Sequence, residues 1–162
     1  MPENSASDKA ASGPRISGCI PRDRTIVAVI DGLGGEFGAA ITMELRKIFG
    51  DAIEIWALGA NSTATGMMMK AKANRGATGE NAIRVYLPGA KVVMGPIAIT
   101  WANAMMGEIT PGLAEAVMKA ETLKFLIPIS QENITLVGQK NETLSILISD
   151  AIRQLARRMC LP

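Results

Sequence analysis

The sequence predicts an α/β fold: a Rossmann-like, doubly wound, mostly parallel sheet of about five strands with helices on both faces. Short apolar runs rich in β-branched residues alternate with amphipathic helical patterns. The connections between them are short, which is typical of βαβ units. The first apolar run, residues 25–30, leads into a glycine-rich loop and then a helical pattern, as at the first strand of a doubly wound domain.

In the first half, residues 25–30 are continuously apolar, as in a strand covered on both faces. Residues 38–49 have apolar side chains at helical spacing, and Gly50 ends this helix. A strand over 52–58 and a helix over 62–73 follow, with Ser62 or Thr63 as the cap. Residues 74–81 are expected to be a polar connector.

In the second half, we expect strands over 91–95, 123–129 and 134–137, and helices over 98–106 and 142–159. A further helix begins at Thr110-Pro111, with the threonine as cap and the proline at the first position. The length of 162 residues fits one domain, over residues 25–162. Residues 1–24 are rich in Ser, Ala, Gly, Pro and charge, which predicts a disordered leader.

Composition narrows the classes of function. Hydrophobic residues make up 48%, enough for a core, whereas 4% aromatics and a net charge of +2 argue against nucleic-acid binding. Histidine is absent, which excludes histidine-dependent catalysis and histidine metal sites. The two cysteines form no motif, which fits a reducing compartment. No apolar run is long enough for a membrane span, and residues 1–24 lack the apolar section of a signal peptide, so we expect a cytoplasmic protein.

The glycine loop after the first strand is the default ligand site of such a fold. Its glycines let the backbone turn and let an anion approach the amides at the start of the next helix. The spacing G-x-G-x-x-x-G departs from the dinucleotide fingerprint, and no P-loop lysine follows. Two interpretations remain open: a tight strand-to-helix turn without a ligand, or a site for a nucleotide, dinucleotide or other anion. The candidate residues are Gly32, Gly34, Gly35 and Gly38.

Asp31 ends the first apolar run, where an unpartnered carboxylate would be costly to bury. We favour hydrogen bonds from the amides of the glycine loop to this carboxylate. A role in binding Mg²⁺ or substrate is the alternative. No metal ligands or catalytic residues can be assigned from the sequence.

Polar residues that follow other predicted strands are further candidates for the same site. Each has a structural alternative: a helix cap, a connector or a surface position. Asn103 differs, because it interrupts an apolar helical pattern and would need partners if buried. These candidates are Asn61, Ser62, Thr78, Gly79, Glu80, Asn81, Asn103 and Glu108.

The methionines at 67–69 and 105–106 suggest a contact surface, because consecutive helical residues cannot all face the chain's own core. We therefore expect a homo-oligomer through Met-rich helices, with ordinary core packing as the alternative.

Six motifs resemble those of a family of short, uncharacterised bacterial proteins. They are "IDGLGGEFG" (30–38), "ALGAN" (57–61), "GATGENAI" (76–83), "GPI" (95–97), "ANAMMGEITP" (102–111) and "LIP" (126–128). The family's pattern has a more basic, Cys-containing turn after "LIP", where this chain has Ile129-Ser130-Gln131. The resemblance implies a Rossmann-like fold and no activity. It also suggests one composite site, since most of the motifs follow predicted strands.

Three hypotheses about function remain. The first is a protein that binds a nucleotide or another small anionic metabolite at the glycine loop. The second is a carboxylate- or Mg-dependent enzyme acting on a phosphorylated small molecule, with Asp31, Glu80 or Glu108 as acid–base groups. The third is a structural subunit of a larger complex. The lack of histidine and of a recognised catalytic motif favours the first.

Overall fold

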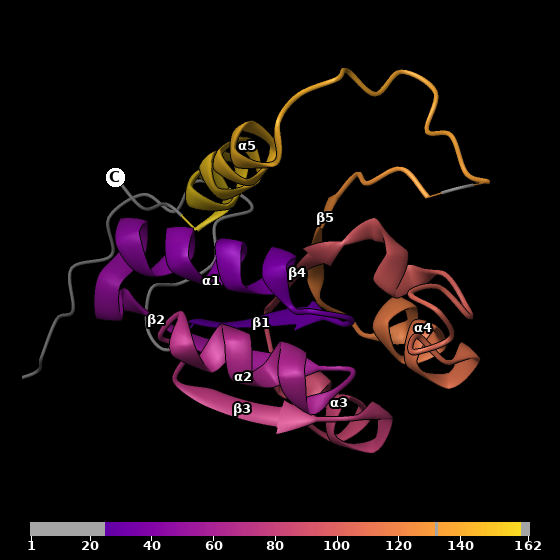
Figure 1. Ribbon diagram of the computed structural model, residues 1–162. Coiled ribbons are helices and arrows are strands. Elements are labelled where there is room, and N and C mark those ends of the chain that lie inside the picture. The colour runs from indigo at the N-terminus through magenta and orange to yellow at the C-terminus, as the bar shows by residue number, and fades with distance from the viewer. Residues whose placement is uncertain (1–24, 132, 160–162) are drawn as a thin grey trace, which may run out of the picture.

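The computed structural model describes residues 25–131 and 133–159 and confirms the α/β fold. The predicted leader, residues 1–24, lies outside the described residues. Five strands form one all-parallel sheet in the order β3-β2-β1-β4-β5 (Figure 1). Their bounds are β1 Thr25–Asp31, β2 Ile53–Gly59, β3 Arg75–Thr78, β4 Val92–Pro96 and β5 Leu123–Ile127.

The strand order reverses at β1. The chain first builds outward from β1 through β2 to β3, and then crosses over to place β4 on the other side of β1. In doubly wound sheets, the crevice at such a reversal, beyond the carboxyl ends of the strands, is where ligands bind. The glycine loop follows β1 at this point.

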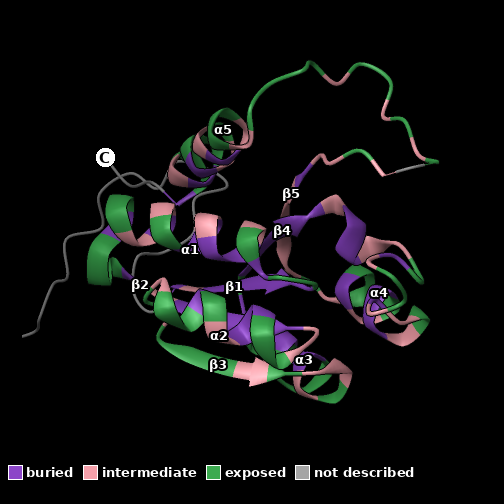
Figure 2. Ribbon diagram, viewed as in Figure 1, coloured by how far each residue is buried: buried purple, intermediate pink, exposed green. Residues whose placement is uncertain are grey.

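Helices cover both faces of the sheet, as predicted. One apolar cluster joins the strands to α1 (Glu36–Phe49), α2 (Ser62–Lys70) and α5 (Leu144–Arg158). A second cluster, on the opposite face, joins them to α3 (Glu80–Tyr86) and α4 (Pro111–Lys119). Figure 2 shows the buried central strands between helices whose outer sides are exposed. Within the described part of the chain, no helix has the length and apolar character needed to cross a membrane.

Three expected elements are wrong. The connector over 74–81 contains β3, a short and mostly exposed edge strand. Its glycine and polar residues do not form the apolar pattern that predicts a strand. The helix over 98–106 is replaced by a 3-10 turn, Ile97–Thr100, and a series of turns. The strand over 134–137 is reduced to a single bridge between Gln131 and Ile134.

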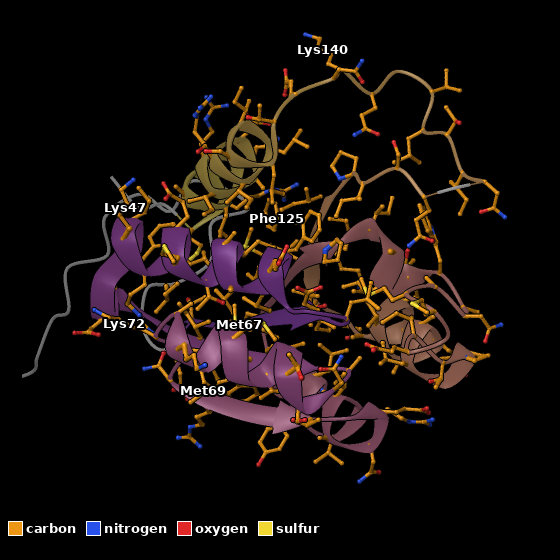
Figure 3. All side chains as sticks on the ribbon, viewed as in Figure 1. Lys47, Met67, Met69, Lys72, Phe125 and Lys140 are labelled. Atoms are coloured by element: carbon orange, nitrogen blue, oxygen red, sulfur yellow. The ribbon has the colours of Figure 1, made fainter. Side chains whose placement is uncertain are left out.

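The methionines of α2 divide between the core and the surface. Met68 is fully buried and belongs to the core cluster around α1, whereas 36% of Met67 and 39% of Met69 is exposed. Figure 3 labels both exposed methionines on α2. The contact surface expected for residues 67–69 therefore cannot include Met68.

Candidate functional site

The glycine loop is a tight turn closed by the protein's own groups. The Gly35 N–H donates to the Gly32 carbonyl at 3.0 Å. Asp31, 2% exposed, accepts from the Gly32 N–H at 2.8 Å and from the Gly38 N–H at 2.6 Å, one bond on each carboxylate oxygen. This confirms that the Asp31 carboxylate accepts from loop amides, and it explains how a buried carboxylate is tolerated.

A second carboxylate, Glu108, reaches the same loop from the segment before α4. Its Oε2 accepts from the Leu33 N–H at 2.7 Å and from Asn61 Nδ2 at 2.8 Å. Asn61 Nδ2 also donates to the Leu33 carbonyl at 2.9 Å, while Asn61 Oδ1 caps α2 by accepting from the Ala64 N–H. Glu108 and Asn61 thus tie together the ends of β1 and β2 and the segment after β4.

Glu108 is brought there by a left-handed stretch of backbone. Asn103, Met105, Met106 and Gly107 have φ values of 65°, 55°, 56° and 89°. For non-glycine residues this conformation costs about 1–2 kcal/mol each. Such strain persists where surrounding contacts impose it, and it is typical of functional segments. Because a right-handed helix needs negative φ values, the expected helix over 98–106 does not form.

A separate hydrogen-bonded cluster joins α3 to α4. Glu80 Oε2 accepts from Thr110 Oγ1 at 2.5 Å, and Arg84 lies 3.2 Å from its other oxygen. The Thr110 hydroxyl bond and, next, the Arg84 bond lower the pKa of Glu80 below its ordinary value. Thr110 also caps α4 through the Leu113 N–H, as predicted for Thr110-Pro111. Glu80 therefore acts as a structural partner here.

A cavity of about 410 Å³ lies beside the glycine loop, at the reversal of strand order. Its walls are mainly apolar, and among the described residues only Asp31 and Glu36 line it with a charged side chain. No described residue accepts a hydrogen bond from the N–H groups of Gly34, Glu36 and Phe37, which stand at the start of α1 beside this cavity. The other described residues of the lining are Gly32, Leu33, Gly35, Pro96, Ala98, Met105, Ile129, Ser130 and Gln131.

The four candidate glycines of the loop have different roles. A Cβ on Gly32 would lie 2.8 Å from both Glu108 Oε2 and Met105 Sδ, and one on Gly38 would lie 2.6 Å from Met68 Sδ. Gly35 has φ 75°, and a Cβ there would lie 2.5 Å from the Ala64 Cα. Close packing therefore explains why glycine stands at these three positions. Gly34 differs, because the atom nearest to a Cβ added there would be Glu36 Cγ, at 3.9 Å.

The structure does not bring all the candidate residues together. Within the described part of the chain, Ser62, Asn81 and Asn103 are exposed and their side chains form no hydrogen bond. The Thr78 hydroxyl lies 2.7 Å from that of Thr65, and the Gly79 N–H donates to the Gly59 carbonyl. The single composite site suggested by the motifs is thus two clusters, one around Asp31 and Glu108 and one around Glu80.

Sequence reasoning missed most of the cavity wall: Phe37, Pro96, Ala98, Met105 and residues 129–131. Residues 129–131 could have been predicted, because they follow β5 and the carboxyl ends of neighbouring parallel strands share one edge of the sheet. The contact of Met105 with the loop had no such signal, since it depends on the left-handed turn.

Burial raises the pKa of Asp31 above its ordinary value of 3.8, opposed by the Gly38 and Gly32 N–H groups and reinforced by the charges of Glu108 and Glu36. The folded state thus holds this proton more tightly than the unfolded state. As the pH rises from 3.8 through the raised pKa, this group's contribution to stability is lost.

We therefore expect Asp31→Asn to gain stability relative to the wild type as the pH rises from roughly 3 to 7. Urea unfolding of both proteins at a series of pH values measures this difference. The control is Asp51→Asn, which removes one carboxylate at an exposed position. A difference that shrinks with rising pH would contradict the raised pKa of Asp31.

Among the described residues, no group of three Asp, Glu, Cys or His side chains is arranged to hold a metal ion. The geometry that the structure does offer is an apolar cavity with free amides at a helix start, beside a loop closed by two carboxylates.

The fold and this loop define the chain as a Rossmann-like α/β domain with a glycine-rich turn after its first strand. The chain belongs to the family described as Domain of unknown function (DUF3842), whose model matches residues 26–160. This agrees with the resemblance to an uncharacterised family. No curated protein matches the chain.

Among solved structures, the chain is similar to a dodecameric FMN-dependent Ubix-like decarboxylase from Escherichia coli O157:H7. The sequence identity is 13% and the TM-score is 0.42, over 82% of this chain and 76% of the other.

Proposed function

We propose that the protein binds a small metabolite with one anionic group and an apolar or flat portion, a nucleotide being the class that fits best. The observation that carries this proposal is that the N–H groups of Gly34, Glu36 and Phe37, beside the 410 Å³ cavity, donate to no described residue. Amides at the start of a helix attract anions, and α1 is 14 residues long. The apolar wall suits a base or another ring.

The charges around the cavity limit the anion to a small one. Within residues 25–131 and 133–159, no Lys or Arg lines the cavity, while Asp31 and Glu36 do. The amides of Gly32, Leu33 and Gly38 are already used by Asp31 and Glu108. The amides of the glycine loop that remain for an anion are therefore those of Gly34, Glu36 and Phe37. They favour a single phosphate or carboxylate over the pyrophosphate of a dinucleotide.

Binding is better supported than the carboxylate- or Mg-dependent enzyme. Both oxygens of Asp31 accept loop N–H groups, Glu80 is bonded to Thr110 and Arg84, and Glu108 is bonded to Leu33 and Asn61. A general acid or base must be able to reach its substrate. In this arrangement these three carboxylates are committed to the fold.

A thermal-shift titration tests the proposal. We expect nucleoside monophosphates to raise the melting temperature more than the corresponding triphosphates do. A ligand present at 100 times its Kd adds roughly 2.7 kcal/mol to the free energy of unfolding. Gly34→Val is expected to abolish the shift, because its side chain projects into open space beside the free amides without disturbing packing. Binding titrations of the same ligands by calorimetry provide a second readout.

The matched control is Gly66→Val on α2, outside the cavity lining, where an added Cβ would meet nothing within 4 Å. It should retain the ligand-induced shift. If no phosphorylated or carboxylated metabolite stabilises the wild type, the proposal fails and the structural-subunit hypothesis takes its place. If Gly34→Val retains a full shift, the ligand binds elsewhere.

A further inference from the structure

The outer edge of β5 is unpaired. β5 pairs with β4 on one side, and no other described strand lies against it. The Leu123 N–H donates to the Lys91 carbonyl, on the β4 side. Because backbone groups alternate along a strand, the N–H and C=O groups of Lys124 and Leu126 point outward. Such an edge is a template for another strand.

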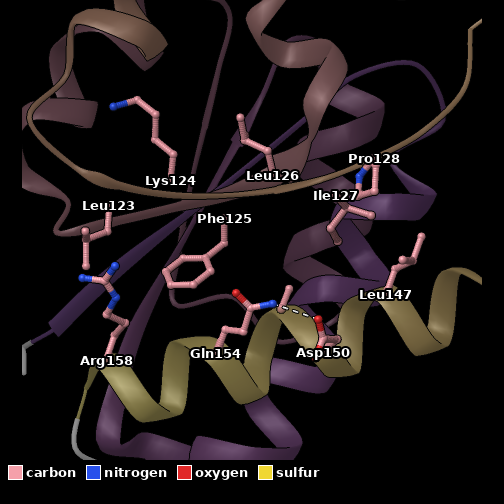
Figure 4. A pocket seen from close by; sticks show the side chains of 11 residues that line it. Leu123, Lys124, Phe125, Leu126, Ile127, Pro128, Leu147, Asp150, Gln154 and Arg158 are labelled. Carbon is pink, nitrogen blue, oxygen red and sulfur yellow. Dashed lines mark hydrogen bonds between the residues drawn. The ribbon is translucent and has the colours of Figure 1, made fainter. Parts of the chain in front are cut away.

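A groove of about 440 Å³ runs between this edge and α5. Leu123 and Phe125 point toward α5, and Lys124 and Leu126 point away from it (Figure 4). The two elements run in opposite directions. Along the groove, Arg158 lies at the Leu123 end, Gln154 at the level of Phe125, and Asp150 toward the Ile127 end.

The residues that line the groove are placed symmetrically, in sequence, about Phe125 on β5 and Gln154 on α5. Leu123 and Ile127 lie two residues either side of Phe125, and Arg158 and Asp150 lie four residues either side of Gln154. Four residues of strand span roughly 13 Å, and eight residues of helix span roughly 12 Å. If a two-fold axis beside Phe125 and Gln154 related two copies of the chain, the Leu123 end of one groove would lie opposite the Ile127 end of the other.

We propose that a second copy of this chain pairs with β5 in antiparallel register about such an axis. Lys124 then lies opposite Leu126 of the second copy, and the outward N–H and C=O groups of both form a hydrogen-bonded pair. Phe125 lies opposite Phe125 of the second copy in a non-hydrogen-bonded pair. The two five-stranded sheets become one continuous sheet.

The charges on α5 fit this partner. Arg158 lines the groove and has no ion-pair or hydrogen-bond partner among the described residues. The two-fold axis brings it to Asp150 of the second copy, twice per dimer. A self-complementary patch of this kind forms a closed, isologous interface.

The edge also lacks the usual protection against pairing. A lysine on an edge strand commonly repels other strands. Here the Lys124 ammonium donates to the Ala120 and Thr122 carbonyls at the start of the strand, so its charge is held away from the centre of the edge. β5 contains no proline within Leu123–Ile127 and is mostly apolar. The opposite edge, β3, is shorter and mostly exposed.

A disulfide at position 125 tests the register. In a Cys19→Ser/Cys160→Ser background, Phe125→Cys is expected to form a covalent dimer of twice the 17.1 kDa chain mass on mild oxidation. The Cα atoms of a non-hydrogen-bonded antiparallel pair lie about 4.5 Å apart, within disulfide range. Leu123→Cys is the matched control, because its partner would be Ile127, and it should remain monomeric on a denaturing gel.

Charge reversal tests the ion pairs without touching β5. Sedimentation or light scattering should give a dimer for the wild type, with dimer affinity reduced at least tenfold in Arg158→Glu and in Asp150→Lys. The combined variant should regain it, because the swapped charges again face each other. A wild-type monomer, a dimer indifferent to both reversals, or equal crosslinking at positions 123 and 125 would each overturn the proposal.

Discussion

Met68→Glu is expected to unfold the protein. Met68 is 0% exposed and sits between α2 and α1, where its Sδ occupies the space beside Gly38. It belongs to an apolar core cluster with Ile41, Leu45 and Ala57. An unpaired carboxylate buried there, together with the lost packing, costs at least about 4 kcal/mol, a large fraction of the stability of a small domain.

Urea unfolding followed by circular dichroism measures this effect. The control is Met67→Glu on the same helix, which should change the free energy of unfolding by less than about 1 kcal/mol because that position is partly exposed. A folded Met68→Glu protein with a changed oligomeric state would instead place Met68 on a contact surface. If α2 forms such a surface, Met67 and Met69 are the residues that provide it.

Gly35→Ala is expected to lower the free energy of unfolding by about 2–5 kcal/mol. The backbone at Gly35 has φ 75°, which costs a non-glycine residue about 1–2 kcal/mol. The added Cβ would also lie 2.5 Å from the Ala64 Cα, so α1 and α2 must move apart, and overpacking of this kind costs about 1–3 kcal/mol.

The matched control is Gly34→Ala, one residue earlier in the same loop, where the added methyl group meets nothing closer than 3.9 Å. It should melt within a few degrees of the wild type, since surface changes rarely exceed 0.5 kcal/mol. Equal destabilisation by both variants would contradict the packing role assigned to Gly35. The comparison also separates the glycines required by the fold from the one available to a ligand.

The sequence predicts most of the architecture because strand periodicity and helix signals are local. β1, β2, β4 and β5 appear within two residues of their expected bounds, and Thr110 caps α4 as its motif indicates. β3 escapes prediction because Arg75-Gly76-Ala77-Thr78 lacks an apolar pattern, and only pairing with β2 makes it a strand.

The site is harder to predict because it depends on contacts between distant segments. The bonds that Asp31 makes with its neighbouring loop follow from their closeness in sequence. The reach of Glu108 to Leu33 does not, because it depends on a left-handed turn that no helical or strand pattern signals. The sequence does not show which loop amides donate within the protein. Asp31 and Glu108 accept from those of Gly32, Leu33 and Gly38.

The placement of β1 has a consequence for the way the chain is made. β1, α1, β2, α2 and β3 are consecutive and can assemble while the rest is still on the ribosome, but the second side of β1 stays bare until β4 is synthesised. During that interval the nascent chain exposes an apolar strand, Thr25–Asp31, to other nascent chains. Slow translation between β3 and β4 should therefore lower the yield of soluble protein, and rapid translation should raise it.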